Sequence, residues 1–210
     1  MKTLYEKIRE KHGKPKPILF NTEMVRAIIG GQKTQTRRPI QAPGNEYHYE
    51  KLLCDLGLSC KLEIIEDELH WELQTAVDDS GTYTEKLLHQ PGDILYVRET
   101  FADISETEPG NIHYKASANE EDLEWFNENG WNWRPSIHMP KRIARLFLKV
   151  TDVRVERLHE TTGVDVVREG FKEPQNFIKA WNEIYKEKGY GWDEDPWVWV
   201  IEFEVSEIEK

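Results

Sequence analysis

The sequence predicts an α+β domain built around a small antiparallel or mixed β-barrel of five or six strands. The clearest strand runs from Trp197 to Val205, where every second residue is apolar. Helical patterns cluster at 22–29 and 162–189 instead of alternating with strands, which argues against βαβ units. In the strand pattern after Ile143, the buried parity switches at Thr151-Asp152, so a β-bulge or tight bend is expected, as in barrel strands.

The N-terminal part of the chain contains the first strand and helix. Residues 1–15 are polar and rich in lysine, and we expect them to be loosely attached. Ile18-Leu19-Phe20 is typical of a short buried strand, after which Asn21 or Thr22 caps a helix that ends at Gly30-Gly31. A strand from Lys33 to Ile40 follows.

Two segments are expected to be insertions. In 41–90, apolar residues alternate as in a hairpin, and we expect this insertion to lie on the main sheet. The alternating residues are Leu62, Ile64, Leu69, Trp71 and Leu73. Segment 103–130 is acidic and carries a helix capped by Asn119 and ended by Gly130.

The remaining elements complete a single domain with a core of 17–40 and 91–205. A strand at Ile94–Val97 follows the turn at Pro91-Gly92-Asp93. The pattern Thr162-Gly163-Val164-Asp165 is a capping box that opens a short helix ended by Gly170. A second helix begins after Pro174 and stops at Gly189.

Composition limits the class of protein. The formal net charge is −11 and the pI is near 5.2, which argues against general adhesion to nucleic acid. No apolar run is long enough for a membrane helix, and we expect a soluble cytoplasmic protein. Cys54 and Cys60 are expected to be free thiols, and no zinc spacing is present, so we predict no metal and no cofactor.

Positive charge is nevertheless concentrated in two segments without acidic residues. The first, from Arg26 to Asn45, contains Lys33, Arg37 and Arg38. The second, from Trp131 to Arg145, contains Arg134, Lys141 and Arg142. Two such segments in an acidic chain indicate one local anion site.

Four segments together resemble the ASCH domain family, in its phage-associated branch. They are Gly31 to Arg38 (pattern G-x-K-T-x-T-x-R), Pro91 to Phe101, Trp133 to Pro140 and Val166 to Gly170. The resemblance covers 17–40 and 91–205 and implies a PUA-like β-barrel, a fold that binds RNA and modified nucleosides. It also extends to the small N4-acetylcytidine amidohydrolases, although those enzymes are about half as long and have no counterpart of the two insertions.

Matching the motifs residue by residue implies that Lys33, Thr36 and Glu169 are catalytic. Thr36 would be the nucleophile, and Lys33 could act as its base if its pKa fell from about 10.4 to roughly 7 or 8. Arg37 and Arg38 would lower that pKa by like charge. Glu169, in the last turn of its helix, faces the negative end of the helix dipole, which favours a protonated general acid. In a regular strand Lys33 and Thr36 would point to opposite faces, so we predict that Lys33 lies in the turn after Gly31.

Further residues are predicted to bind the substrate, a modified nucleoside or single-stranded RNA. Near the catalytic residues these are Thr34, Arg37 and Arg38. Arg98 and Glu99 fit either a structural pair or a phosphate-binding arginine oriented by its neighbour. The indole of Trp133 could stack on a base while Arg134, Ser136 and His138 make polar contacts, although His138 fits an ordinary loop histidine equally well.

The leading functional hypothesis is therefore a nucleotide-recognising ASCH protein that removes an acyl group from N4-acylated cytidine. A second hypothesis is a non-catalytic RNA-binding module that uses the same residues. A third is a ribonuclease with Lys33 and His138 as acid and base.

Overall fold

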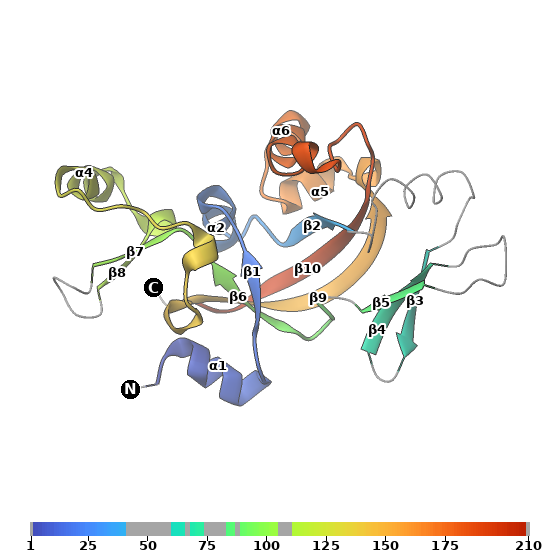
Figure 1. Ribbon diagram of the computed structural model, residues 1–210, viewed down its shortest axis with the longest axis horizontal. Helices are drawn as coiled ribbons and strands as arrows, with labels where there is room; N and C mark the ends of the chain where they lie inside the picture. Colours follow the sequence, from blue (N-terminus) through green and yellow to red (C-terminus); the bar gives the residue numbers. More distant parts are fainter. Residues whose placement is uncertain are drawn as a thin grey trace.

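The computed structural model describes residues 2–40, 60–65, 68–73, 83–86, 89–104 and 111–208. Its centre is a five-stranded sheet with the strand order β1-β6-β9-β10-β2 (Figure 1). These strands are β1 (Lys16–Leu19), β6 (Ile94–Arg98), β9 (Leu146–Arg157), β10 (Trp197–Ile208) and β2 (Gln35–Pro39). β1 and β6 are parallel, and the other neighbouring strands are antiparallel. A mixed sheet covered by helices confirms the predicted α+β class.

The ladder between β9 and β10 contains the predicted bulge. Glu202 pairs with Asp152 and Phe203 pairs with Val150, so Thr151 is an extra residue on β9. Val150 and Val153 are both buried in the same core cluster. The bulge restores the inward direction of the apolar side chains after the change of parity.

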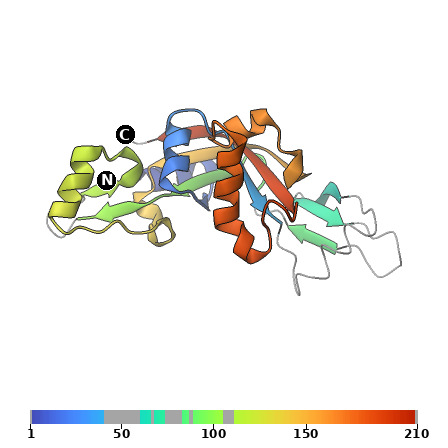
Figure 2. The ribbon, with the colours of Figure 1, turned by 90° about the horizontal axis from the view of Figure 1, so that it is seen from above.

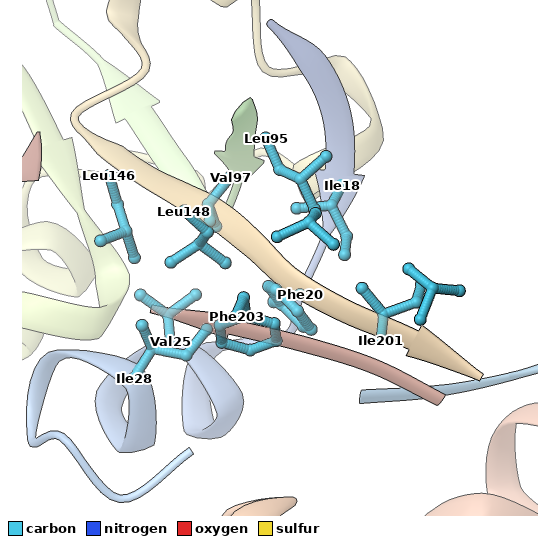
Figure 3. Packing of buried hydrophobic residues seen from close by; sticks show 12 residues of the cluster. Ile18, Phe20, Val25, Ile28, Leu95, Val97, Leu146, Leu148, Ile201 and Phe203 are labelled. Carbon is cyan, nitrogen blue, oxygen red and sulfur yellow. The ribbon is translucent and has the colours of Figure 1, made fainter. Parts of the chain in front are cut away.

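One face of the sheet is covered by α2 (Thr22–Ile29), and Figure 3 shows how Val25 and Ile28 of this helix pack toward Phe203. Asn21 caps the helix, because its side chain accepts a hydrogen bond from the amide of Met24 at 2.8 Å. The helix therefore begins and ends where the sequence predicts, and its end delivers the chain into β2.

The other face is covered by α5 (Gly163–Arg168) and α6 (Pro174–Tyr185). Val198 and Val200 of β10 are completely buried against Phe177 and Trp181 of α6. Because Ile201 and Phe203 lie in the opposite core cluster, β10 is buried on both faces. The predicted capping box at Thr162 is present.

The N-terminal segment is not loosely attached, contrary to the expectation for 1–15. Residues Leu4–His12 form α1, and its Tyr5 and Ile8 are each only 3% exposed. They pack in one cluster with Phe147 of β9 and with Ile143. Apolar residues three positions apart form a stripe on an otherwise charged helix, and this stripe anchors the segment.

The predicted hairpin of the first insertion is confirmed. β3 (Cys60–Ile65) pairs with β4 (Glu68–Leu73), with Leu62 opposite Trp71 and Ile64 opposite Leu69. With β5 (Tyr83–Lys86) they make a separate three-stranded sheet. Figures 1 and 2 place this sheet beyond one end of the main sheet instead of on it. Residues 41–59, 66–67, 74–82 and 87–88, which include Cys54, lie outside the described residues.

The second insertion lies at the opposite end of the molecule (Figures 1 and 2). It begins at the last residue of β7 (Phe101–Asp103) and contains β8 (Ile112–Tyr114) and α4 (Glu120–Glu128). As predicted, Asn119 caps α4 and Gly130 follows it with a φ of +69°.

A side-chain hydrogen bond links the two edge strands of the main sheet, β1 and β2. A terminal nitrogen of Arg38 on β2 donates to the carbonyl of Leu19 on β1 at 3.0 Å. Within the described ranges no backbone ladder joins the two strands. The helices described there are all too short or too polar to cross a membrane.

Candidate functional site

Lys33 lies outside the pleat of β2, as predicted. Gly31 adopts a φ of +73°, and the amides of Gln32 and Lys33 both donate to the carbonyl of Ala27, at 2.9 and 3.0 Å. The chain thereby folds back over the last turn of α2, and β2 begins only at Gln35. This turn directs the Lys33 side chain toward the end of α5.

Lys33 and Glu169 form a buried ion pair. Nζ of Lys33 donates to Oε2 of Glu169 at 2.8 Å, to the Glu169 carbonyl at 2.9 Å and to the Gln35 carbonyl at 2.8 Å. The two side chains are 0% and 3% exposed. The three N–H donors of the ammonium thus match three acceptors. Glu169 is the residue that caps the C-terminus of α5, which agrees with its predicted place at the helix end.

Burial and the neighbouring carboxylate act on the pKa of Lys33 in opposite directions. Burial lowers the pKa of the Lys33 ammonium below its usual range, the neighbouring Glu169 carboxylate opposes this, and the charges of Arg38 and Arg37 lower it further. The predicted direction of the arginine effect therefore agrees with the structure. A lysine in this setting gives up its proton more readily than one on the surface, and a carboxylate lies within hydrogen-bonding distance to receive it.

Arg37 holds the other oxygen of Glu169. Its side chain is fully buried, and one terminal nitrogen donates to Oε1 of Glu169 at 3.3 Å. The second terminal nitrogen donates to Glu156 at 2.9 Å and lies 3.6 Å from a carboxylate oxygen of Asp165. Arg37 is therefore a buried component of the ion-pair cluster, not a surface cation that could bind a phosphate.

Thr36 and Glu169 line one small pocket between β2 and α6. Arg37 and Arg38 line it too, and the rest of its wall is largely apolar. The other lining residues are Met24, Phe171, Phe177, Ala180, Trp181, Ile184 and Tyr185. Lys33 is not part of the lining and reaches the pocket through Glu169. The volume of about 20 Å³ suits one water molecule, whereas ligand pockets usually measure about 300–1,000 Å³.

Arg38 and Thr34 lie on either side of these residues. The guanidinium of Arg38 is 5.5 Å from the centre of the Phe20 ring and 3.5 Å from the hydroxyl of Tyr185. Thr34 is exposed, and its backbone connects α5 to β10 through hydrogen bonds with Arg168 and Phe203, both 2.8 Å long. Arg38 is thus at the pocket, while Thr34 is not among its lining residues.

Arg98 and Glu99 do not pair with each other. Glu99 is 1% exposed and receives two hydrogen bonds from Arg145, at 2.9 and 3.0 Å. Arg98 instead donates to the backbone carbonyls of Ile137 and Met139. Both residues therefore fix the loop 137–145, and neither lines the pocket of Thr36 and Glu169.

The segment from Trp133 to His138 also lies apart from this pocket. The Trp133 ring stacks on Phe126 of α4 with 4.5 Å between ring centres, so one of its faces is occupied. Arg134 pairs through its backbone with Phe101 of β7, and its side chain is exposed. Ser136 and His138 belong to a short 3-10 helix, Ser136–His138, on which His138 is exposed. The structure does not bring these four residues to the pocket.

Sequence reasoning missed the acidic residues that surround Arg37. The sequence pattern identifies Asp165 only as a capping residue. Its carboxylate also accepts a hydrogen bond from the side-chain amide of Gln35 at 3.2 Å. Burial alone would raise the pKa of Asp165, but hydrogen bonds from Thr162 and Gln35 and the charge of Arg37 lower it. Glu156 lies in a strand with alternating charge and gives no local signal of a buried partner. Only the pairing of β9, β10 and β2 brings it to Arg37.

In the described part of the chain, no group of three or more histidine, cysteine, aspartate and glutamate residues could hold a metal ion.

No family model and no curated protein matches the chain. Among solved structures, protein EF3133 from Enterococcus faecalis V583, described under the family model DUF984, is similar with a TM-score of 0.48 and 9% sequence identity. The alignment covers 98% of this chain and 92% of that chain, and a likeness of this degree carries no conclusion about family or function.

Proposed function

We propose that this chain is an ASCH protein with a PUA-like fold that recognises a modified nucleoside or single-stranded RNA and hydrolyses the amide of an N4-acylated cytidine. One observation carries the proposal: Thr36 and Glu169 line the same pocket, and the Glu169 carboxylate is 2.8 Å from Nζ of Lys33. These residues come from two of the four segments that carry the resemblance to the family, Gly31 to Arg38 and Val166 to Gly170. The Arg38 contact between the edge strands is compatible with a small barrel.

The arrangement supports a defined sequence of proton transfers. The Thr36 hydroxyl attacks the acyl carbon, and its proton passes to Lys33. The C–N bond then breaks as the leaving amine of the cytosine takes a proton from Glu169, and a water molecule hydrolyses the resulting ester. The mechanism requires a neutral Lys33 amine as the base and a protonated Glu169 as the acid. Transfer of one proton from the Lys33 ammonium to the Glu169 carboxylate produces both. Direct attack by a water molecule that Lys33 activates uses the same groups.

Substrate binding requires the pocket to widen, because a nucleobase is larger than one water molecule. The wall on the α6 side is the part suited to move. Its polar contact with β2, between the Tyr185 hydroxyl and Arg38, is 3.5 Å long and therefore weak. Its other lining residues are mostly apolar side chains that can slide without leaving a hydrogen bond unsatisfied.

The test is incubation of the purified protein with N4-acetylcytidine and with acetylated and plain oligonucleotides, with products identified by mass. Thr36→Val removes the hydroxyl at nearly constant shape and should lower turnover by about 10³-fold or more if Thr36 is the nucleophile. Thr151→Val makes the same chemical change at an exposed threonine of β9 that does not line the pocket, and it should leave turnover unchanged. A loss below tenfold in Thr36→Val would indicate direct attack by water. Wild-type protein that is inert toward every acylated substrate would refute the proposal.

A non-catalytic RNA-binding module is the second candidate, favoured by the exposed side chains of Arg134 and His138 in a segment without acidic residues. It predicts RNA binding that weakens steeply with salt and survives Thr36→Val. A ribonuclease is a weaker candidate. It needs Lys33 and His138 to act on one substrate, but Lys33 is buried against Glu169, whereas His138 is exposed on a different element and does not line the pocket.

A further inference from the structure

A chain of alternating charges extends from the pocket across the sheet. Behind Glu169 lies Arg37 on β2, whose second carboxylate partner is Glu156 on β9. Glu156 also accepts a hydrogen bond from Arg154, which in turn donates to Glu202 on β10. The order of the ion pairs is Lys33, Glu169, Arg37, Glu156, Arg154 and Glu202. The reactive pair is thus the buried end of a network that reaches three strands.

Arg37 occupies the critical position in this network. Its side chain is 0% exposed, and its two terminal nitrogens bind carboxylates from different elements, Glu169 after α5 and Glu156 on β9. Asp165 of α5 lies 3.6 Å from the nitrogen that binds Glu156, so Glu169 and Asp165 both attract Arg37 from the side of α5. A planar guanidinium held at both terminal nitrogens has a fixed orientation. Since Nζ of Lys33 binds Oε2 of Glu169 while Arg37 binds Oε1, the carboxylate is held between two cations.

We propose that Arg37 is a positioning residue for the Lys33–Glu169 pair and that Glu156 fixes Arg37 from the opposite side. This inference rests on the proposed hydrolysis for its kinetic consequence. Without the Glu156 carboxylate, the Arg37 guanidinium has one counter-ion fewer and shifts toward Glu169. It then competes with Lys33 for the same carboxylate and disturbs the alignment needed for proton transfer.

The variant that tests this is Glu156→Gln, and Asp152→Asn is its matched control. Both remove one negative charge from β9 beside Arg154, because Asp152 lies 3.5 Å from an Arg154 nitrogen, but only Glu156 contacts Arg37. With N4-acetylcytidine, Glu156→Gln should lower kcat by about tenfold or more with KM within twofold, since a misaligned group affects the chemical step. Asp152→Asn should leave both parameters within twofold.

A second measurement does not depend on activity. The protonation of Lys33 can be followed by NMR of ¹⁵N-labelled lysine side chains across a pH titration of the full chain. Glu156→Gln should move the Lys33 titration to lower pH, because the cluster has lost a negative charge and Arg37 lies closer, whereas Asp152→Asn should not move it. If Glu156→Gln does not fold, Glu156→Asp, with a shorter reach to Arg37, should give a smaller shift in the same direction.

The two proposals fail separately. Wild-type protein without hydrolytic activity would overturn the proposed function, while the Lys33 titration would still report on the role of Glu156. A Lys33 titration that is the same in Glu156→Gln as in the wild type would overturn the positioning role, whatever the activity. An equal shift in Asp152→Asn would overturn it too, because the effect would then be general electrostatics.

Discussion

Replacing Gly170 with alanine tests the close approach that brings Glu169 to Lys33. Gly170 has a φ of +94°, and a Cβ added there would lie 2.9 Å from Cβ of Ala27 and 3.3 Å from Cβ of Lys33. The positive φ costs an L-residue about 1–2 kcal/mol. Carbon contacts this short are well inside the optimum of about 3.5–4.0 Å, and such overpacking costs about 1–3 kcal/mol. We therefore expect Gly170→Ala to destabilise the protein by about 2–5 kcal/mol.

Gly92→Ala separates the two contributions. Gly92 has a φ of +93°, but an added Cβ would meet nothing within 4 Å, so only the conformational penalty applies. The free energy of unfolding of both variants, from urea denaturation followed by tryptophan fluorescence, should differ by about 1–3 kcal/mol. Both substitutions also reduce the conformational entropy of the unfolded chain, and this effect is the same for the two variants, so it cancels in the comparison. Equal destabilisation of the two variants would refute the packing of α5 against Lys33 described above.

Three further predictions concern buried titratable groups. Burial lowers the pKa of His89 to about 4, so the unfolded chain takes up a proton at a higher pH than the folded protein does. As the pH falls from 6.5 toward 4, the free energy of unfolding of the wild type, measured by urea denaturation, should therefore decrease by up to about 3 kcal/mol relative to that of His89→Gln. Glu99→Gln leaves the buried Arg145 without its counter-ion and should destabilise by about 3–5 kcal/mol, and a loss below 1 kcal/mol would contradict this. Lys33→Met and Glu169→Leu should each lower the free energy of unfolding by about 3–5 kcal/mol, because each leaves a buried charge without its partner. The double variant should recover most of this loss, and additive losses would argue against a coupled pair.

Local signals in the sequence predicted the elements that carry the site. The capping side chain of Asn21, the capping box at Thr162 and the glycines that end α2 and α5 depend only on residues a few positions apart. The same kind of reasoning placed Lys33 in the turn before β2, because strand alternation forbids it from sharing a site with Thr36 otherwise. The bulge at Thr151 followed from the parity of the buried residues.

Partners that come from distant segments were not predictable in this way. Glu99 follows Arg98 in sequence, but its two hydrogen bonds come from Arg145, which is 46 residues away. Arg98 is the last residue of β6 and Glu99 lies just beyond it, so adjacency in sequence does not bring the two side chains together. The sequence also gives no sign that one face of the Trp133 ring packs on Phe126 in the second insertion. These contacts depend on the packing of β7, α4 and the loop before β9 against one another. Local sequence patterns do not predict that packing.

The buried Lys33–Glu169 pair is difficult to explain by stability alone. Removing two charges from water costs several kcal/mol for each ion, and well-packed apolar residues of similar size are often as stable or more so. The surroundings offer such packing, since Phe20 lies 5.6 Å from Nζ of Lys33 and the pocket beside Glu169 is mostly apolar. The pair is kept in this setting together with a second buried cation, Arg37, and with Thr36 in the same pocket. An amine whose pKa is lowered by burial and a carboxylate at 2.8 Å are the two groups that the proposed proton transfer requires.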